Sequence, residues 1–209
     1  MPYEFWQGRA MIIETLLTTV GIDGAIHLAP MGLTITPAES ASETLPAGWS
    51  LAPFAPSRSL DNLRRRRTAV INLCDDVRIF AGCLTGRRDW PTVPLEDGSG
   101  EARLAAATGF HQISVTPFGN SPVRPRFCCT VTQSQQLQPF VGFCRAQAAV
   151  IEAAILVSRF NRTPARELEA DFQRLGVIIE KTAGPAEFEA WSWIMDSFQS
   201  HLTHPETGD

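Results

Sequence analysis

Several common signatures of function are missing from this sequence of 209 residues. It contains five cysteines, an odd number, and no CxxC pair, which argues against a structural zinc site and a disulfide framework. No run of about 18 apolar residues occurs, so a transmembrane helix is not expected. The first ten residues lack the basic and apolar regions of a secretory signal peptide. These absences favour a cytoplasmic protein with reduced thiols.

Charge and motif content exclude further classes of protein. The net charge is −4 and the isoelectric point is about 5.6, which argues against a general nucleic-acid binder. The motifs GxSxG, HExxH and GxGxxG and the phosphate-binding P-loop are all missing. The sequence therefore offers candidate binding residues without a recognisable catalytic centre.

The chain changes character near Gly142. Before this point, short apolar segments alternate with turns rich in Gly and Pro, which predicts strands. The expected strands are Met11–Thr19, Ala25–Ala29, Gly32–Thr36, Trp49–Phe54, Thr68–Leu73, Val77–Leu84, Phe110–Pro117 and Phe127–Gln133, with Arg87–Glu101 as a loop. After Gly142, helical spacing predicts three helices, namely Ala146–Phe160, one capped by Thr163 with Pro164 at its first position, and one opened by Pro185. This is an α+β pattern, with a β-barrel over residues 1–140 and a C-terminal helical subdomain over residues 141–209.

The segment Pro56–Asp76 joins a short helix, expected over Ser59–Arg66, to the strand that follows it. Arg58 lies at the start of this helix, where free N–H groups favour a phosphate. Ser59 and Asn62 lie three residues apart and can share one helix face with these groups. The alternative is that Ser59 caps the helix and Asn62 satisfies a nearby loop. The spacing alone favours neither interpretation.

Two charged clusters adjoin this helix. Consecutive residues of a helix cannot point the same way, so Arg64–Arg67 is interpreted mainly as a solvated helix face. A nucleic-acid patch is the weaker alternative because no aromatic residues interleave with the arginines. Asp75 and Asp76 would point to opposite faces of an extended segment, so a turn with Asx hydrogen bonds is favoured over a metal or acid–base site.

A second candidate segment, HLAPMG, begins at His27. Pro30 and Gly32 would let the main chain approach a flat ligand closely. A strand kink or bulge is the alternative, and on these residues alone it is the better one.

Two stretches, GIDGAIHLAPMGLTI and PSRSLDNLRRRRTAVINLCDDVRIFAG, resemble flavin-binding split-barrel proteins, a group that includes flavin reductases. Two later stretches, GFCRAQAAVIEAAILVSR and IIEKTAGPAEFEAW, resemble more narrowly the domain-of-unknown-function 447 family of methane-forming archaea and methylotrophic bacteria. The resemblance covers Glu14 to about Trp193. It implies an FMN-binding split β-barrel that forms a homodimer with the flavin near the dimer interface.

The resemblance also implies which residues bind FMN: Thr18, Thr19, His27, Leu28, Ala29, Pro30, Gly32, Arg58, Ser59, Asn62 and Arg145. Arg58, Ser59 and Asn62 would hold the phosphate, and the backbone around Pro30 would run along the isoalloxazine. Arg145 stands in an F-x-R type segment without an assigned role. His27 and Cys144 depart from the family pattern, which often has Asn at both positions.

The function implied by the resemblance is that of an FMN-dependent oxidoreductase of the flavin-reductase-like group. The occurrence of the family suggests an association with tetrahydromethanopterin-dependent one-carbon metabolism. The alternative is a non-catalytic FMN-binding or carrier protein. A nucleic-acid or anionic-partner binder that uses the arginine run is disfavoured by the acidic isoelectric point. No membrane partner is expected.

Overall fold

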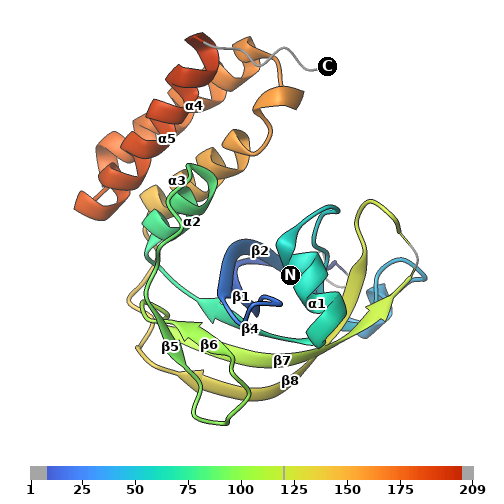
Figure 1. The fold of residues 1–209 in the computed structure, drawn as a ribbon. Helices are drawn as coiled ribbons and strands as arrows, with labels where there is room; N and C mark the ends of the chain where they lie inside the picture. The colour runs from blue at the N-terminus through green and yellow to red at the C-terminus, as the bar shows by residue number, and fades with distance from the viewer. Residues whose placement is uncertain (1–8, 120, 204–209) are drawn as a thin grey trace, which may run out of the picture. The chain divides into compact units, whose positions relative to one another are not determined.

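The computed structural model describes residues 9–119 and 121–203, so the expectation about a secretory signal falls largely outside the described residues. The chain forms two compact units (Figure 1). The barrel unit comprises the chain up to Cys74 together with Pro91–Pro139, and the helical unit comprises Asp75–Trp90 together with the residues after Pro139. The mixed α+β class predicted from the sequence is confirmed.

Six strands close into a barrel in the order β1-β2-β3-β8-β7-β4, and every neighbouring pair is antiparallel. Their bounds are β1 Met11–Val20, β2 Ile26–Thr36, β3 Gly48–Leu51, β4 Thr68–Leu73, β7 Gly109–Phe118 and β8 Arg126–Gln136. Two short strands, β5 Thr92–Pro94 and β6 Ala102–Leu104, form a separate hairpin. The predicted loop Arg87–Glu101 therefore contains strand β5.

The interior of the barrel is apolar. It is filled by buried side chains of the strands, among them Leu17, Leu33, Leu51, Ile71, Ile113 and Phe127. Helix α1, Arg58–Arg66, adds Leu60 and Leu63 to the same core, and both are at most 1% exposed. Because these leucines point inward, the opposite side of α1 remains available to other groups.

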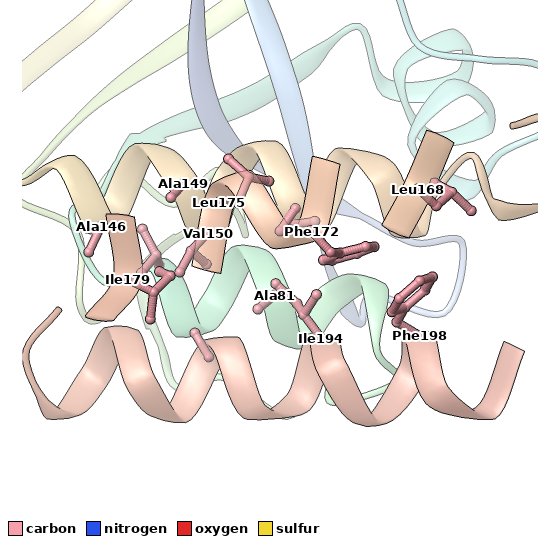
Figure 2. Close-up of a cluster of buried hydrophobic side chains, with 14 residues drawn as sticks. Ala81, Ala146, Ala149, Val150, Leu168, Phe172, Leu175, Ile179, Ile194 and Phe198 are labelled. Atoms are coloured by element: carbon pink, nitrogen blue, oxygen red, sulfur yellow. The ribbon is translucent and has the colours of Figure 1, made fainter. Parts of the chain in front are cut away.

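The helical unit has its own core (Figure 2). Its helices are α2 Val77–Leu84, α3 Arg145–Val157, α4 Ala165–Thr182 and α5 Pro185–Thr203, with a short 3-10 helix at Phe160–Arg162. Small side chains such as Ala81 and Ala149 are buried between them, and the rings of Phe172 and Phe198 stack with centroids 4.3 Å apart. The close helix packing follows from these small residues.

The strand predicted at Val77–Leu84 is wrong, because this segment forms helix α2. The side chain of Asp76 caps the helix by accepting the N–H of Arg78 at 3.1 Å. Val77 and Ala81 lie one turn apart and both enter the core of the helical unit. A short apolar run fits a buried helix as well as a buried strand, and here the cap and the packing decide.

Three smaller expectations also differ from the structure. The predicted break at Pro30 does not occur, because β2 runs unbroken through it. Helix α4 begins at Ala165 with Pro164 in the capping position and no side-chain cap, so the cap predicted at Thr163 is wrong. Helix α3 ends at Val157, a turn follows at Ser158 and Arg159, and the 3-10 helix begins at Phe160, so the predicted segment Ala146–Phe160 is not one continuous helix.

Candidate functional site

Strand β2 has one paired side and one largely open side. It pairs with β1 from Ile26 to Ile35, whereas its pairing with β3 begins only at Leu33. Within the described part of the chain, residues 26–32 therefore form an open edge, and all seven are partly exposed. Pro30 lacks an N–H group and suits such an edge. An apolar, half-exposed edge of this kind can be covered by a flat ligand or a second chain.

Helix α1 begins with incompletely satisfied N–H groups. The Ser57 hydroxyl accepts the N–H of Leu60 at 3.3 Å, and the Ser57 carbonyl accepts that of Asp61 at 3.1 Å. The N–H groups of Arg58 and Ser59 are left without a partner inside the helix. The Arg58 side chain is exposed and makes no hydrogen bond or ion pair with any described residue. This helix start therefore has free donors for an anion.

A pocket of about 470 Å³ lies between α1 and the turn that joins β1 to β2. The helix contributes four residues spaced three, four and seven positions apart, which is one helix face: Arg58, Asp61, Asn62 and Arg65. Residues 21–27 provide the other wall, except Gly24. The volume is typical of small-molecule sites. We refer to this cavity as the α1 pocket.

Hydrogen bonds hold the two walls of the α1 pocket together. The Asn62 amide donates to the Thr19 hydroxyl at 3.0 Å, and both side chains are buried. The Arg65 guanidinium donates to the carbonyl of Val20 at the end of β1. In the turn, Gly24 has φ +80° and the Ala25 N–H donates to the Asp23 carboxylate at 3.0 Å. The two walls are thus linked by bonds within the chain itself.

The charges in the α1 pocket are mixed. Two arginines and the two carboxylates of Asp23 and Asp61 line it. No ion pair within 4.0 Å joins these four groups in the described residues. Because Arg65 already donates to Val20, the uncommitted positive group is Arg58 beside the helix start. An anion is therefore favoured at that end of the pocket.

The structure brings together some of the predicted site residues. His27, Arg58 and Asn62 line the α1 pocket, and Thr19 lies directly behind Asn62. Ser59 is 3% exposed and is not part of the lining. The predicted residues further along β2 belong to the open edge: Leu28, Ala29, Pro30 and Gly32. A Cβ atom on Gly32 would lie 3.0 Å from Ile12 Cγ2, so packing within the hairpin already favours glycine there.

Thr18, another of the predicted residues, is buried in a network of hydrogen bonds. Its hydroxyl donates to the Ala102 carbonyl of β6 at 2.6 Å and accepts from the Asn72 amide at 3.2 Å. The Asn72 carbonyl oxygen in turn accepts the Leu104 N–H at 2.7 Å. These bonds fasten β6 to the barrel. The hydrogen of the Thr18 hydroxyl is therefore already used within the fold.

Two other predicted positions lie in the helical unit. Arg145 is the first residue of α3 and lines a pocket of about 470 Å³ with Glu152 and Arg174. Asp76 caps α2 and pairs with Arg78 at 2.7 Å, which agrees with the predicted turn with Asx hydrogen bonds. The described residues contain no cluster of three or more metal-ligating side chains.

Sequence reasoning missed the role of two arginines. Arg65 and Arg66 donate to the main-chain carbonyls of Val20 and Ser99, the latter at 2.7 Å, so they are not merely a solvated face. Arg64 and Arg67 are exposed, as predicted. A signal was available in the sequence, because Arg65 follows Arg58 by seven residues and so shares its helix face.

The chain resembles several solved structures. An FMN-bound protein from Methanosarcina mazei, described as a DUF447 protein, has a TM-score of 0.74 and 15% identity over 93% of this chain and 98% of its own. Flavoredoxin from Methanosarcina acetivorans has a TM-score of 0.48 and 13% identity over 63% and 75% of the two chains. The 2-nitrobenzoate 2-nitroreductase of Pseudomonas fluorescens has a TM-score of 0.45 and 16% identity, over 59% of this chain and 64% of its own. The first of these shows a shared fold.

No curated protein matches the sequence. Two family matches together span most of the chain. Residues 13–138 match the N-terminal domain of the protein of unknown function DUF447, and residues 144–196 match the second DUF447 domain. The first match alone covers more than half of the sequence, and the resemblance noted in its motifs is thereby confirmed. The chain belongs to the DUF447 family.

Proposed function

We propose that this protein is an FMN-binding flavoprotein and that the α1 pocket receives the flavin phosphate. The observation that carries the proposal is that Arg58 lines this pocket at the helix start, where two N–H groups have no partner within the helix. A guanidinium and a helix N-terminus together form a phosphate-binding arrangement. The shared fold of an FMN-bound DUF447 protein supports the choice of FMN over other phosphates.

The isoalloxazine ring would lie along the open edge of β2. The side chains of Leu28, Ala29 and Pro30 are partly exposed there and offer an apolar surface. His27 connects the α1 pocket to the open edge of β2, since it lines the pocket and is the first residue of the segment HLAPMG. A second copy of the chain would cover the same edge, which is the reason for proposing a homodimer. Light scattering of the purified protein measures this directly.

We further propose an oxidoreductase of the flavin-reductase-like group. When bound, FMN supplies the hydride-transfer chemistry, so the protein needs to supply position and electrostatics. Arg58 would hold the phosphate. The hydrogen bond between Asn62 and Thr19 would fix the wall of the pocket and so determine how deeply the phosphate enters. The association with tetrahydromethanopterin-dependent one-carbon metabolism rests on the occurrence of the family.

The visible spectrum and an FMN titration test the proposal. The purified protein should be yellow or should take up added FMN with a saturable change in flavin fluorescence. A colourless preparation that takes up no FMN would reject the flavoprotein. For a protein that binds FMN, mixing with NADH or NADPH without oxygen separates the two functions. Bleaching within seconds supports the oxidoreductase, whereas persistent colour supports the non-catalytic carrier.

A further inference from the structure

The helical unit contains a pocket of its own, with a volume of about 650 Å³. Three segments form it: the chain just after α2, the end of α3 with the following 3-10 helix, and the C-terminal part of α5. The lining is rich in polar side chains: Thr85, Arg87, Ser158, Asn161, Arg162, Asp196, Ser197, Ser200 and His201. Trp193, Phe160 and Val157 supply its apolar part.

Arg87 is exposed, and several contacts hold it in place. Its N–H donates to the Gly82 carbonyl at 2.8 Å, and its carbonyl accepts the indole N–H of Trp90 at 3.0 Å. Its guanidinium donates to the Thr85 hydroxyl at 3.1 Å and lies 4.4 Å from the ring centroid of Trp193. These contacts restrict the Arg87 side chain before any ligand binds, which lowers the entropy cost of binding.

The charges of Arg87 and of Arg162, the second arginine of the lining, are not neutralised by a nearby carboxylate. No described carboxylate lies within 4.0 Å of either guanidinium. Asp196 is the single acidic side chain in the lining, which also contains two arginines and His201. The helical unit as a whole has more carboxylates than basic side chains. The pocket is therefore a local positive site on an acidic background.

The remaining groups suit a phosphate with an attached organic part. Hydroxyls of Ser197 and Ser200 and the amide of Asn161 provide neutral donors beside the two guanidinium groups. Phe160 stacks on His201 with centroids 4.7 Å apart and an interplanar angle of 17°, which forms a flat aromatic wall. Two arginines, short hydroxyl side chains and aromatic faces are a phosphate-ester environment rather than a purely apolar one.

We propose that this pocket binds a phosphate group, carried by a small metabolite or as free polyphosphate, in a site distinct from the α1 pocket. Arg87 provides the prearranged cation and Arg162 the second one. Asp196 opposes the anion and limits its affinity. The site depends only on residues of the helical unit, so it does not rest on the flavin proposal.

Calorimetric titration of the full chain with pyrophosphate, and separately with adenosine monophosphate, tests the site. Saturable binding of either one is expected. Tighter binding of the monophosphate identifies an aromatic metabolite as the ligand class, and tighter binding of pyrophosphate identifies free polyphosphate. The variant Arg162→Gln should weaken binding about tenfold, as for loss of one charge-assisted hydrogen bond. Asp196→Asn should strengthen binding.

Two matched controls make the result specific. Arg159 is exposed, lies three residues before Arg162 and is outside the lining, so Arg159→Gln should change the affinity less than about twofold. Arg58→Gln removes the proposed phosphate contact of the α1 pocket, so binding that survives this substitution belongs to the helical unit. The proposal is overturned if neither ligand binds, if Arg159→Gln matches Arg162→Gln, if Arg58→Gln abolishes binding, or if Asp196→Asn weakens it.

Discussion

Replacement of Arg58 by Gln is the sharpest test of the α1 pocket. The substitution removes the charge and keeps most of the side-chain length. The Arg58 side chain has no hydrogen bond or ion pair with a described residue, so its replacement breaks no side-chain contact that holds the fold together. Any large effect on FMN affinity would therefore come from the ligand rather than from unfolding.

The expected magnitude follows from the exposure of the group. A hydrogen bond to a charged partner contributes about 1.5–3 kcal/mol. Arg58 is exposed, and the carboxylates of Asp23 and Asp61 line the same pocket, so solvent and opposite charge reduce the contribution. We expect a loss near the lower limit, about 1.5 kcal/mol, which raises the Kd for FMN about tenfold.

Quenching of flavin fluorescence on titration with protein measures this Kd. The matched control is Arg64→Gln, because Arg64 is exposed on the same helix but lies outside the lining. Riboflavin, which lacks the phosphate, provides a second control. Its affinity should be the same for the wild type and for Arg58→Gln.

Three outcomes would refute the reasoning. Equal losses from Arg58→Gln and Arg64→Gln would indicate a diffuse basic patch. An unchanged Kd for Arg58→Gln in a protein that binds FMN would place the phosphate elsewhere. An equal loss of riboflavin affinity would mean that Arg58 acts on the ring or on the fold instead of on the phosphate.

Three further predictions concern stability, measured by urea or thermal unfolding. Asn72→Ala removes three donated hydrogen bonds and leaves the Leu104 N–H without its acceptor. The free energy of unfolding should therefore fall by about 2–4 kcal/mol, and an unchanged value would contradict this bonding. A double-mutant cycle of Asn62→Ala and Thr19→Val should give a coupling energy of about 1 kcal/mol, and additive effects would count against the 3.0 Å bond. Burial raises the pKa of Cys129 from 9.0 to about 12, so above pH 9 only the folded state keeps this proton and stability falls as the pH rises toward 12. Cys129→Ala should lessen that alkaline loss of Tm, and an identical pH profile would disprove the assignment.

Local patterns predicted much of the barrel unit. Alternation and Gly–Pro turns located β1, β4, β7 and β8 within a few residues, because strands that are buried on one or both faces must carry that pattern. The position of α1 was likewise readable from Leu60 and Leu63, which are both buried. Strand order was not readable, since it depends on pairings between distant segments.

The candidate site was only partly readable for the same reason. The helix spacing placed Arg58 and Asn62 on one face, and the structure brings both into the α1 pocket. The opposite wall comes from the β1–β2 turn, some 35 residues earlier in the chain. No local sequence pattern predicts that this turn and α1 line the same pocket. Thr18 shows the limit most clearly, because its bond to Ala102 joins residues 84 positions apart.

Helix α2 shows how distant residues can decide a local structure. The segment VRIFAGCL is apolar enough for a buried strand, and it follows β4 after three residues. This segment forms a helix because Val77 and Ala81 then pack in one core with Ala146, Ala153 and Ile194. Those partners lie at least 65 residues later, so the part of the chain before Gly142 could not by itself reveal the choice. Because the chain leaves the barrel unit after Cys74 and returns at Pro91, this helix is an insertion into the barrel sequence that completes the helical unit. Its conversion to a strand would therefore expose the core of the helical unit, which explains why a helix is the more stable alternative.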